Sequence, residues 1–249
     1  MRKTQFYFLV FISGLFFHLQ LSAQNITLES VWKTYDYIPK TVGGWKWLPD
    51  GKFYVEQTAD ANGKQCIIKV EAESGKTVDT LMKGNDFLPK DSIKCILMQD
   101  FDLSPDGKKI LIATNKEAIY RHSTMETNFI FFRESKKLEA LSNKGKQRYA
   151  QFSNDGMKVC YIINNNLFYA DLLAEEITEV QMTKDGEKNK IIYGATDWVY
   201  EEEFGINRAF YWSPDNKKIL YYRFDESNVK EYSLDYFETK NYPRNEKYK

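Results

Sequence analysis

The sequence predicts an all-β fold made of repeated sheets, and three observations support this. A turn motif of the Ser-Pro-Asp-Gly type recurs, with its aspartates at intervals of 56, 49 and 60 residues: Asp50, Asp106, Asp155 and Asp215. Four short apolar strands can be counted within one repeat, and helical periodicity is hard to find after residue 24. Such repeats are typical of a β-propeller, whose blades are four-stranded antiparallel sheets. A β-sandwich gives no reason for the same turn to recur.

The first residues have the pattern of a secretory signal peptide. Two basic residues precede an apolar run from 6 to 17, and a small-residue cleavage site ends at Ala23. We therefore expect residues 1–23 to be removed and the mature chain, 24–249, to be secreted or held in the periplasm or cell envelope. The alternative is an uncleaved N-terminal membrane anchor, although this run is shorter than the roughly 20 residues that a spanning helix needs.

Charge and cysteine content argue against several functions. Because residues 1–23 hold two basic and no acidic residues, the remaining chain has 33 Lys and Arg against 35 Asp and Glu, which does not attract nucleic acid. The three cysteines, Cys66, Cys95 and Cys160, are far apart and flanked by apolar residues, which favours buried thiols over a disulfide framework. No C-x-x-C or H-E-x-x-H motif occurs, so we expect no metal and no cofactor.

The repeated turn places the strands. Pro at its second position fixes φ, and Gly or Asn two places later accepts positive φ, so each motif reverses the chain between two strands. The predicted strands of the first and third repeats are 42–47, 52–57, 65–71 and 77–82, then 149–152, 158–163, 167–171 and 177–182. Four turns predict about four blades, which is the low end for a closed propeller.

Two segments, 115–126 and 183–208, interrupt this rhythm and are candidates for function, because loops on a rigid scaffold carry most binding chemistry. The first contains Tyr-Arg-His-Ser at 120–123. The second contains Asp-Trp-Val-Tyr-Glu-Glu-Glu at 197–203. Three adjacent carboxylates repel one another and are kept ionised in a packed site only by positive charge, such as a ligand ammonium. A solvated charged face is the alternative.

The residues indicate binding rather than catalysis. The chain has no G-x-S-x-G elbow, and His122 is the single histidine after residue 23, so we expect no catalytic residue in this chain. Two carboxylates side by side can accept the hydrogen bonds of an α-ammonium group. Adjacent side chains point to opposite faces of a strand, so Glu202 and Glu203 can converge only on a helical turn or a bulge.

The acidic run, the Arg-His-Ser segment and the following Trp-Ser-Pro-Asp at 212–215 resemble the dipeptidyl peptidase IV family, most strongly from about Asp102 to Tyr236. The resemblance implies an eight-bladed propeller followed by an α/β-hydrolase domain that carries the catalytic serine. About four of a probable eight blades are then present, so residues 24–249 are the N-terminal part of a truncated propeller. We expect this chain alone, without the hydrolase domain, to be inactive.

The resemblance also implies a function and its residues. In the family, the last two glutamates of the run bind the substrate amino terminus, and the arginine donates to a carbonyl of the bound dipeptide. These roles carry over to Glu202, Glu203 and Arg121, with Glu201 as the structural member. The expected substrate is a peptide with a free N-terminus, cleaved after an Xaa-Pro or Xaa-Ala dipeptide. The expected partners are the missing hydrolase domain and a second copy of the chain. A non-catalytic envelope propeller that only binds partners is the alternative.

Overall fold

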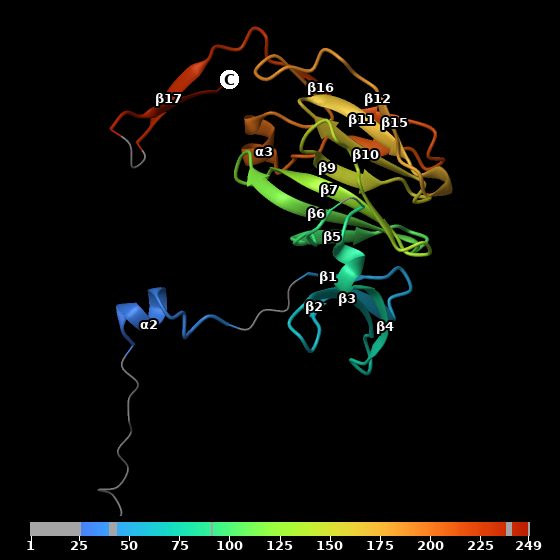
Figure 1. Cartoon of the computed structure of the whole chain (residues 1–249). Helices are drawn as coiled ribbons and strands as arrows, with labels where there is room; N and C mark the ends of the chain where they lie inside the picture. Colours follow the sequence, from blue (N-terminus) through green and yellow to red (C-terminus); the bar gives the residue numbers. More distant parts are fainter. Residues whose placement is uncertain (1–25, 40–43, 91, 238–240, 249) are drawn as a thin grey trace, which may run out of the picture. The chain divides into compact units, whose positions relative to one another are not determined.

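The computed structural model describes residues 26–39, 44–90, 92–237 and 241–248 (Figure 1). The expected signal peptide lies outside this part of the chain and stays a prediction. Among the described residues, no helix is both long enough and apolar enough to cross a bilayer.

The chain divides into two compact units between Val42 and Gly43, and each is described by itself. The first contains a five-residue helix, α2 (Leu28–Trp32). A capping box starts this helix, because Thr27 and Ser30 each donate a backbone N–H to the other's hydroxyl at 3.0 Å.

Three four-stranded antiparallel sheets follow in the second unit, each with its strands in chain order. They are β1 (Trp45–Trp47), β2 (Phe53–Ala59), β3 (Gln65–Glu71) and β4 (Thr77–Lys83); β5 (Asp100–Leu103), β6 (Lys109–Ala118), β7 (Thr124–Phe132) and β8 (Lys137–Ala140); and β9 (Arg148–Phe152), β10 (Lys158–Ile163), β11 (Asn166–Asp171) and β12 (Thr178–Gln181). Short 3-10 turns, η1 (Gly84–Phe87) and η2 (Leu173–Glu175), follow β4 and β11. The predicted sheets of the first and third repeats are confirmed, and β3 and β10 have the predicted bounds.

The fourth repeat differs from a four-stranded blade. Its strands form separate antiparallel pairs: β13 (Ile191–Tyr193) with β16 (Arg223–Asp225), β14 (Phe210–Trp212) with β15 (Ile219–Tyr221), and β17 (Tyr232–Tyr236) with β18 (Arg244–Tyr248). The chain bends between β15 and β16 at Tyr222, whose N–H donates to Ala209 O and whose carbonyl accepts from Gly194 N–H. Before the bend the chain pairs with β14, and after it the chain pairs with β13. Closure into a propeller and a total of eight blades stay predictions.

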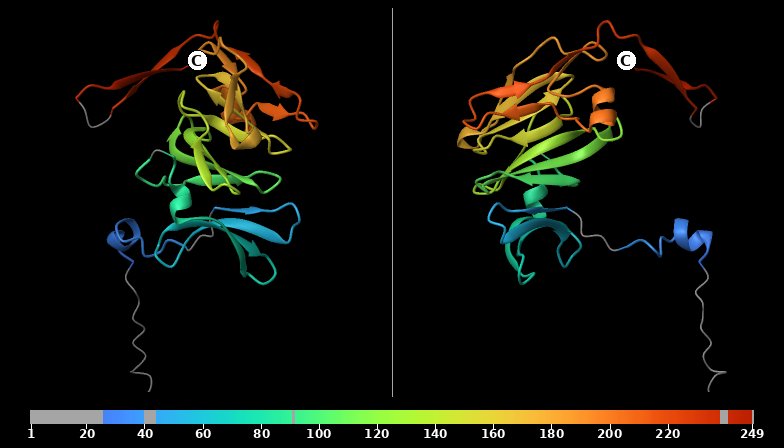
Figure 2. Two further views of the ribbon diagram at one scale, coloured as in Figure 1. Left: turned by 45° about the vertical axis from the view of Figure 1, so that its right-hand side comes forward. Right: turned by 180° about the vertical axis from the view of Figure 1, so that it is seen from behind.

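Consecutive sheets pack face to face, as the two views of Figure 2 show. Strand β6 shows why, because Ile110 and Ile112 belong to the core shared with the first sheet, and Leu111 belongs to the core shared with the third. Alternate residues of a strand point to opposite faces, so the middle sheet is buried on both sides. A third core joins β10 and β11 to β13 and β14 around the fully buried Phe210.

The four predicted turns are equivalent in the structure, which confirms the repeat. In each, the aspartate Oδ1 accepts a backbone N–H two residues later: at 2.9 Å for Asp50, 3.0 Å for Asp106 and Asp155, and 3.2 Å for Asp215. The next residue has positive φ in every case: Gly51, Gly107, Gly156 and Asn216. The repeat motif is therefore a side-chain-capped turn that joins two antiparallel strands in each repeat: β1 to β2, β5 to β6, β9 to β10 and β14 to β15.

The cysteines agree with the prediction at two of three positions. Cys66 and Cys160 are buried free thiols, and burial raises the pKa of both. Cys95 is exposed, so the expectation of a third buried thiol was wrong. It lies in the link between η1 and β5, where Ile93 and Leu97 are also exposed, and apolar neighbours in such a link do not imply burial.

The turn aspartates predict a pH-dependent contribution to stability. Partial burial alone would raise the pKa of Asp106, but the Ser104 hydroxyl, the Lys108 N–H and the Lys109 ammonium lower it overall. A carboxyl whose pKa is lower in the folded state stabilises the fold above its unfolded pKa of about 3.9, and that stabilisation is lost as the pH falls through the folded value.

We therefore expect Asp106→Ala to reduce the free energy of unfolding by about 1 to 3 kcal/mol at pH 7, with a smaller reduction near pH 3. Urea unfolding of the chain at the two pH values measures this. The control is Glu73→Ala, which removes an exposed carboxylate and should change stability by less than about 0.5 kcal/mol. An equal loss at both pH values would show that the charge of Asp106 contributes nothing.

Candidate functional site

The acidic run lies on a short helix, α3 (Trp198–Phe204), between β13 and β14. Asp197 caps its first turn by accepting the Tyr200 N–H at 2.9 Å. Gly205 ends it in the left-handed conformation, with φ of 64°. The expectation that the glutamates lie on a helical turn is confirmed.

Packing and main-chain bonds fix α3 on the fourth repeat. The ring of Tyr200 lies 4.9 Å from that of Phe224 in β16 and 5.1 Å from that of Phe204. Before and after the helix, the Thr196 hydroxyl donates to Ile206 O at 2.5 Å, and Thr196 N–H donates to Asn207 O at 3.2 Å. Thr196, which lies before the helix, is therefore bonded to two residues that lie after it, Ile206 and Asn207. We call these three residues the neck of α3.

The three glutamates of α3 have three different environments. Successive residues of a helix rotate by about 100°, so adjacent side chains leave in different directions. Glu201 is 2% exposed, the Glu202 side chain is 16% exposed, and Glu203 is exposed. Within the described part of the chain, Glu203 accepts no hydrogen bond and forms no ion pair. The run is thus neither wholly solvated nor wholly buried.

The second candidate segment is the hairpin tip between β6 and β7, and Figure 1 shows it beside α3. Ser123 closes the tip, because its carbonyl accepts Ile119 N–H at 2.8 Å and its hydroxyl accepts Tyr120 N–H at 3.2 Å. His122 joins the tip to the helix, since its N–H donates to Glu201 Oε1 at 2.7 Å. Asn207 Nδ2 donates to the His122 carbonyl at 3.0 Å.

Arg121 and Glu202 are brought together by this contact. Arg121 Nε lies 3.6 Å from Glu202 Oε2, although the two residues are far apart in the sequence. The arginine side chain is 74% exposed, and an ion pair this exposed contributes only about 0 to 1 kcal/mol. The pair can therefore open for a ligand at little cost. Glu203 lies next to Glu202 on the helix but does not contact Arg121.

One hollow in the surface lies near the Arg121–Glu202 pair, and a larger one lies far from it. The nearer one, of about 500 Å³, is lined by Tyr120, Thr196 and Arg148, among others. Arg148 Nε is buried there and donates no hydrogen bond to any residue that the structure describes. Burial raises the pKa of Tyr120, and the Glu226 carboxylate adds to this effect. Both hollows lack Arg121, Glu202 and Glu203 in their linings, so a cavity shared by these three stays a prediction for the whole protein.

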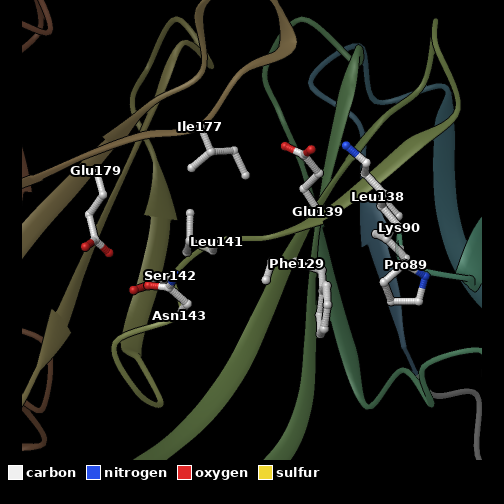
Figure 3. Close-up of a pocket in the computed structure, with 11 residues that line it drawn as sticks. Pro89, Lys90, Phe129, Leu138, Glu139, Leu141, Ser142, Asn143, Ile177 and Glu179 are labelled. Atoms are coloured by element: carbon white, nitrogen blue, oxygen red, sulfur yellow. The ribbon is translucent and has the colours of Figure 1, made fainter. Parts of the chain in front are cut away.

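The larger hollow, of about 660 Å³, lies away from α3, between β8 on one side and Ile177 and the β12 residue Glu179 on the other (Figure 3). Figure 3 shows Lys90 and Glu139 on one side of it and Glu179 on the other. Glu179 already accepts from the Tyr161 hydroxyl at 2.6 Å and pairs with Lys144 at 2.5 Å. The Glu179 carboxylate is therefore already held by structural contacts. No three His, Cys, Asp or Glu side chains gather into a metal site in the part of the chain described.

Sequence reasoning located Arg121 and the glutamates but missed the contacts that join them. Nothing in the sequence indicates that Glu201 binds the main-chain N–H of His122, 79 residues away, or that Asn207 binds the carbonyl of the same residue. The single signal available in the sequence was that both motifs lie in interruptions of the repeat, at 115–126 and 183–208.

Comparisons with known proteins agree with the fold and show which proteins the chain resembles. The family model described as "Dipeptidyl peptidase IV (DPP IV) N-terminal region" matches residues 104–249. A probable dipeptidyl-aminopeptidase B of Aspergillus terreus is 33% identical over 224 residues, which are 85% of this chain and 24% of that protein. One from Emericella nidulans is 38% identical over 138 residues, which are 54% of this chain and 15% of that protein.

The crystal structure of Porphyromonas gingivalis dipeptidyl peptidase 4 superposes with a TM-score of 0.80 at 34% identity. The superposition covers 91% of this chain and 31% of that one. The chain thus spans about a quarter of the length of the first curated relatives and about a third of this structure.

Proposed function

Because this chain belongs to the dipeptidyl peptidase IV N-terminal region family, we propose that it is the propeller portion of a secreted serine exopeptidase that removes N-terminal dipeptides of the Xaa-Pro or Xaa-Ala type. Its part in the reaction is to hold the substrate amino terminus. The observation that carries this proposal is the Arg121–Glu202 pair, with Glu203 beside it and without an ion pair to any residue that the structure describes. The whole protein supplies the serine and its base from an α/β-hydrolase domain.

The chemistry of the proposed site follows from charge. An α-ammonium group has three N–H donors, and Glu202 and Glu203 offer carboxylates on one helical turn to accept them. Arg121 faces Glu202 and can turn its guanidinium to a carbonyl of the bound dipeptide. Internal peptide bonds lack the ammonium charge, so such a site selects the free end of a chain. Among the described residues Glu203 has no partner to give up, and the Arg121–Glu202 pair opens at little cost.

The proposal also covers the location of the protein and its partners. Secretion, or retention in the periplasm or cell envelope, is supported by the basic, apolar and small-residue pattern of residues 1–23. The partners are a peptide with a free N-terminus, the hydrolase domain of the same protein, and a second copy of the chain. The relatives, named as dipeptidyl aminopeptidases, favour this function over a non-catalytic propeller.

Replacing Arg121 by Ala tests the proposal in the whole protein. We expect KM for a Gly-Pro arylamide to rise about tenfold, because one charge-assisted hydrogen bond to the substrate is lost. The reaction of the serine with a small fluorophosphonate, which has no amino terminus, should stay within about twofold, since Arg121 positions substrate and does not activate the nucleophile. Equal losses with both reagents would contradict the assignment.

A further inference from the structure

Glu201 is the buried member of the acidic run, and its burial requires an explanation. A carboxylate removed from water is costly unless it is hydrogen-bonded. Glu201 accepts one hydrogen bond within the described residues, from the His122 N–H at 2.7 Å. A charge-assisted bond of this length is among the stronger kinds in proteins. The buried carboxylate is therefore used to hold the hairpin tip.

The carbonyl of the same residue is also bound. Asn207, in the neck below α3, donates from Nδ2 to His122 O at 3.0 Å, and its Oδ1 accepts the Arg208 N–H at 2.7 Å. The amide of Asn207 is thus fixed on both sides. Glu201 and Asn207 together bind the N–H and the C=O of His122, and we call this arrangement the His122 clamp.

Arg121 precedes the clamped residue and has little to hold it in place. Its side chain is 74% exposed, and its 3.6 Å pair with Glu202 is too exposed to define a position by itself. We infer that Glu201 and Asn207 are positioning residues, whose His122 clamp fixes the backbone of Arg121 so that its guanidinium lies opposite Glu202. This inference rests on the proposed function. Adjacent glutamates then have separate tasks, because Glu201 orients the loop and Glu202 faces the ligand.

The clamp makes a specific chemical demand on each position. At 201 it needs a hydrogen-bond acceptor of the same length, which Gln supplies without charge and Ala does not supply. At 207 it needs a donor, which Ala lacks. A role of Glu201 through its negative charge would instead make Gln as harmful as Ala. The Gln and Ala variants therefore separate positioning from direct electrostatic attraction of the substrate.

The experiment uses the whole protein and two readouts. Hydrogen exchange of the segment 119–123 reports the clamp, and kcat and KM for a Gly-Pro arylamide report its consequence. The variants are Glu201→Ala, Glu201→Gln, Asn207→Ala and Arg121→Ala, together with Glu201→Ala/Arg121→Ala. Glu203→Ala is the matched control for exchange, because it removes a neighbouring carboxylate that does not contact the tip. Asn207→Ala carries the test if Glu201→Ala does not fold.

We expect Glu201→Ala and Asn207→Ala to speed exchange in 119–123 and to raise KM about tenfold with kcat within about twofold. Glu201→Gln should leave exchange unchanged and KM within about threefold of wild type. In the Arg121→Ala background, adding Glu201→Ala should raise KM by less than about twofold, because residues that act through one another are not additive.

Two results would overturn the inference: unchanged exchange in both Ala variants, or effects of Glu201→Ala and Arg121→Ala on KM that multiply. The proposed function fails separately. Arg121→Ala with unchanged KM would count against the role of Arg121, and the exchange data would still decide whether the His122 clamp holds the tip.

Discussion

Replacement of Glu203 or Glu202 by Gln in the whole protein is expected to lower kcat/KM for Gly-Pro arylamides about 30-fold or more. Gln keeps the size and hydrogen-bonding capacity of Glu but removes the charge. A desolvated contact between opposite charges is worth about 2 to 5 kcal/mol when one partner is lost. Because 1.4 kcal/mol corresponds to about tenfold, the lower limit corresponds to about 30-fold.

The two positions should differ in a second property. Glu202 pairs with Arg121 at 3.6 Å in the free protein, whereas Glu203 has no such partner in the described residues. Glu202→Gln therefore also releases Arg121, and Arg121→Ala should cost less in that background than in wild type. In the Glu203→Gln background the full effect of Arg121→Ala should remain. Steady-state kinetics of the single and double variants measure both.

Glu201→Gln serves as the control, since the same change one residue earlier should stay within about threefold of wild type. The measurement also has a clear negative outcome. If the Glu202→Gln and Glu203→Gln enzymes cleave Gly-Pro substrates as well as wild type, no ammonium is held there. The acidic run would then be a charged face that happens to lie near Arg121.

The strands and turns could be predicted because their signals are local. The turn at Asp106, for example, is determined by Pro105, an aspartate that caps a nearby N–H, and a glycine with φ of 68°. The alternation of Ile110, Leu111 and Ile112 is equally readable, although which neighbouring sheet each residue contacts is not. Local chemistry fixed the elements, and the repeat period supplied their order.

The fourth repeat was harder because its arrangement depends on distant pairing. The bend at Tyr222 between β15 and β16 follows from bonds to Ala209 and Gly194, which the strand pattern does not show. In the candidate site, too, the local features could be predicted and the contacts between distant segments could not. Its charged residues were visible as motifs, whereas the buried contact of Glu201 with the hairpin tip joins two blades.

The polar segment 184–190 shows a further limit of the sequence, because its composition does not indicate what holds its backbone. Most of its side chains are exposed, yet Asn166 binds its backbone on both sides of Gly186. Asn166 Oδ1 accepts the Gly186 N–H at 2.9 Å, and Nδ2 donates to Gly186 O at 3.1 Å. Asn165 Nδ2 adds a bond to Glu187 O at 3.2 Å. The β10–β11 turn therefore anchors the segment that leads to β13 and α3.

Gly186→Ala is accordingly expected to lower the free energy of unfolding by about 3 kcal/mol, because a methyl group has no room at this position. A Cβ there would lie 2.4 Å from Asn165 O and 2.8 Å from Asn166 Cγ. The oxygen is main chain and already accepts the Tyr193 N–H at 3.0 Å, so it can move only by straining the start of the fourth repeat.

Urea unfolding of the chain measures the loss, and Gly51→Ala is the matched control. Gly51 has φ of 64° and open space around its Cβ position, so its replacement adds only backbone strain of about 1 to 2 kcal/mol. Gly186→Ala should cost more than Gly51→Ala and should also speed proteolysis at Lys184, Lys188 and Lys190. If the Gly186→Ala chain is as stable as the Gly51→Ala chain, the hydrogen bonds between Asn166 and Gly186 contribute little to stability. The position of α3 would then depend on the bonds of Thr196 with Ile206 and Asn207.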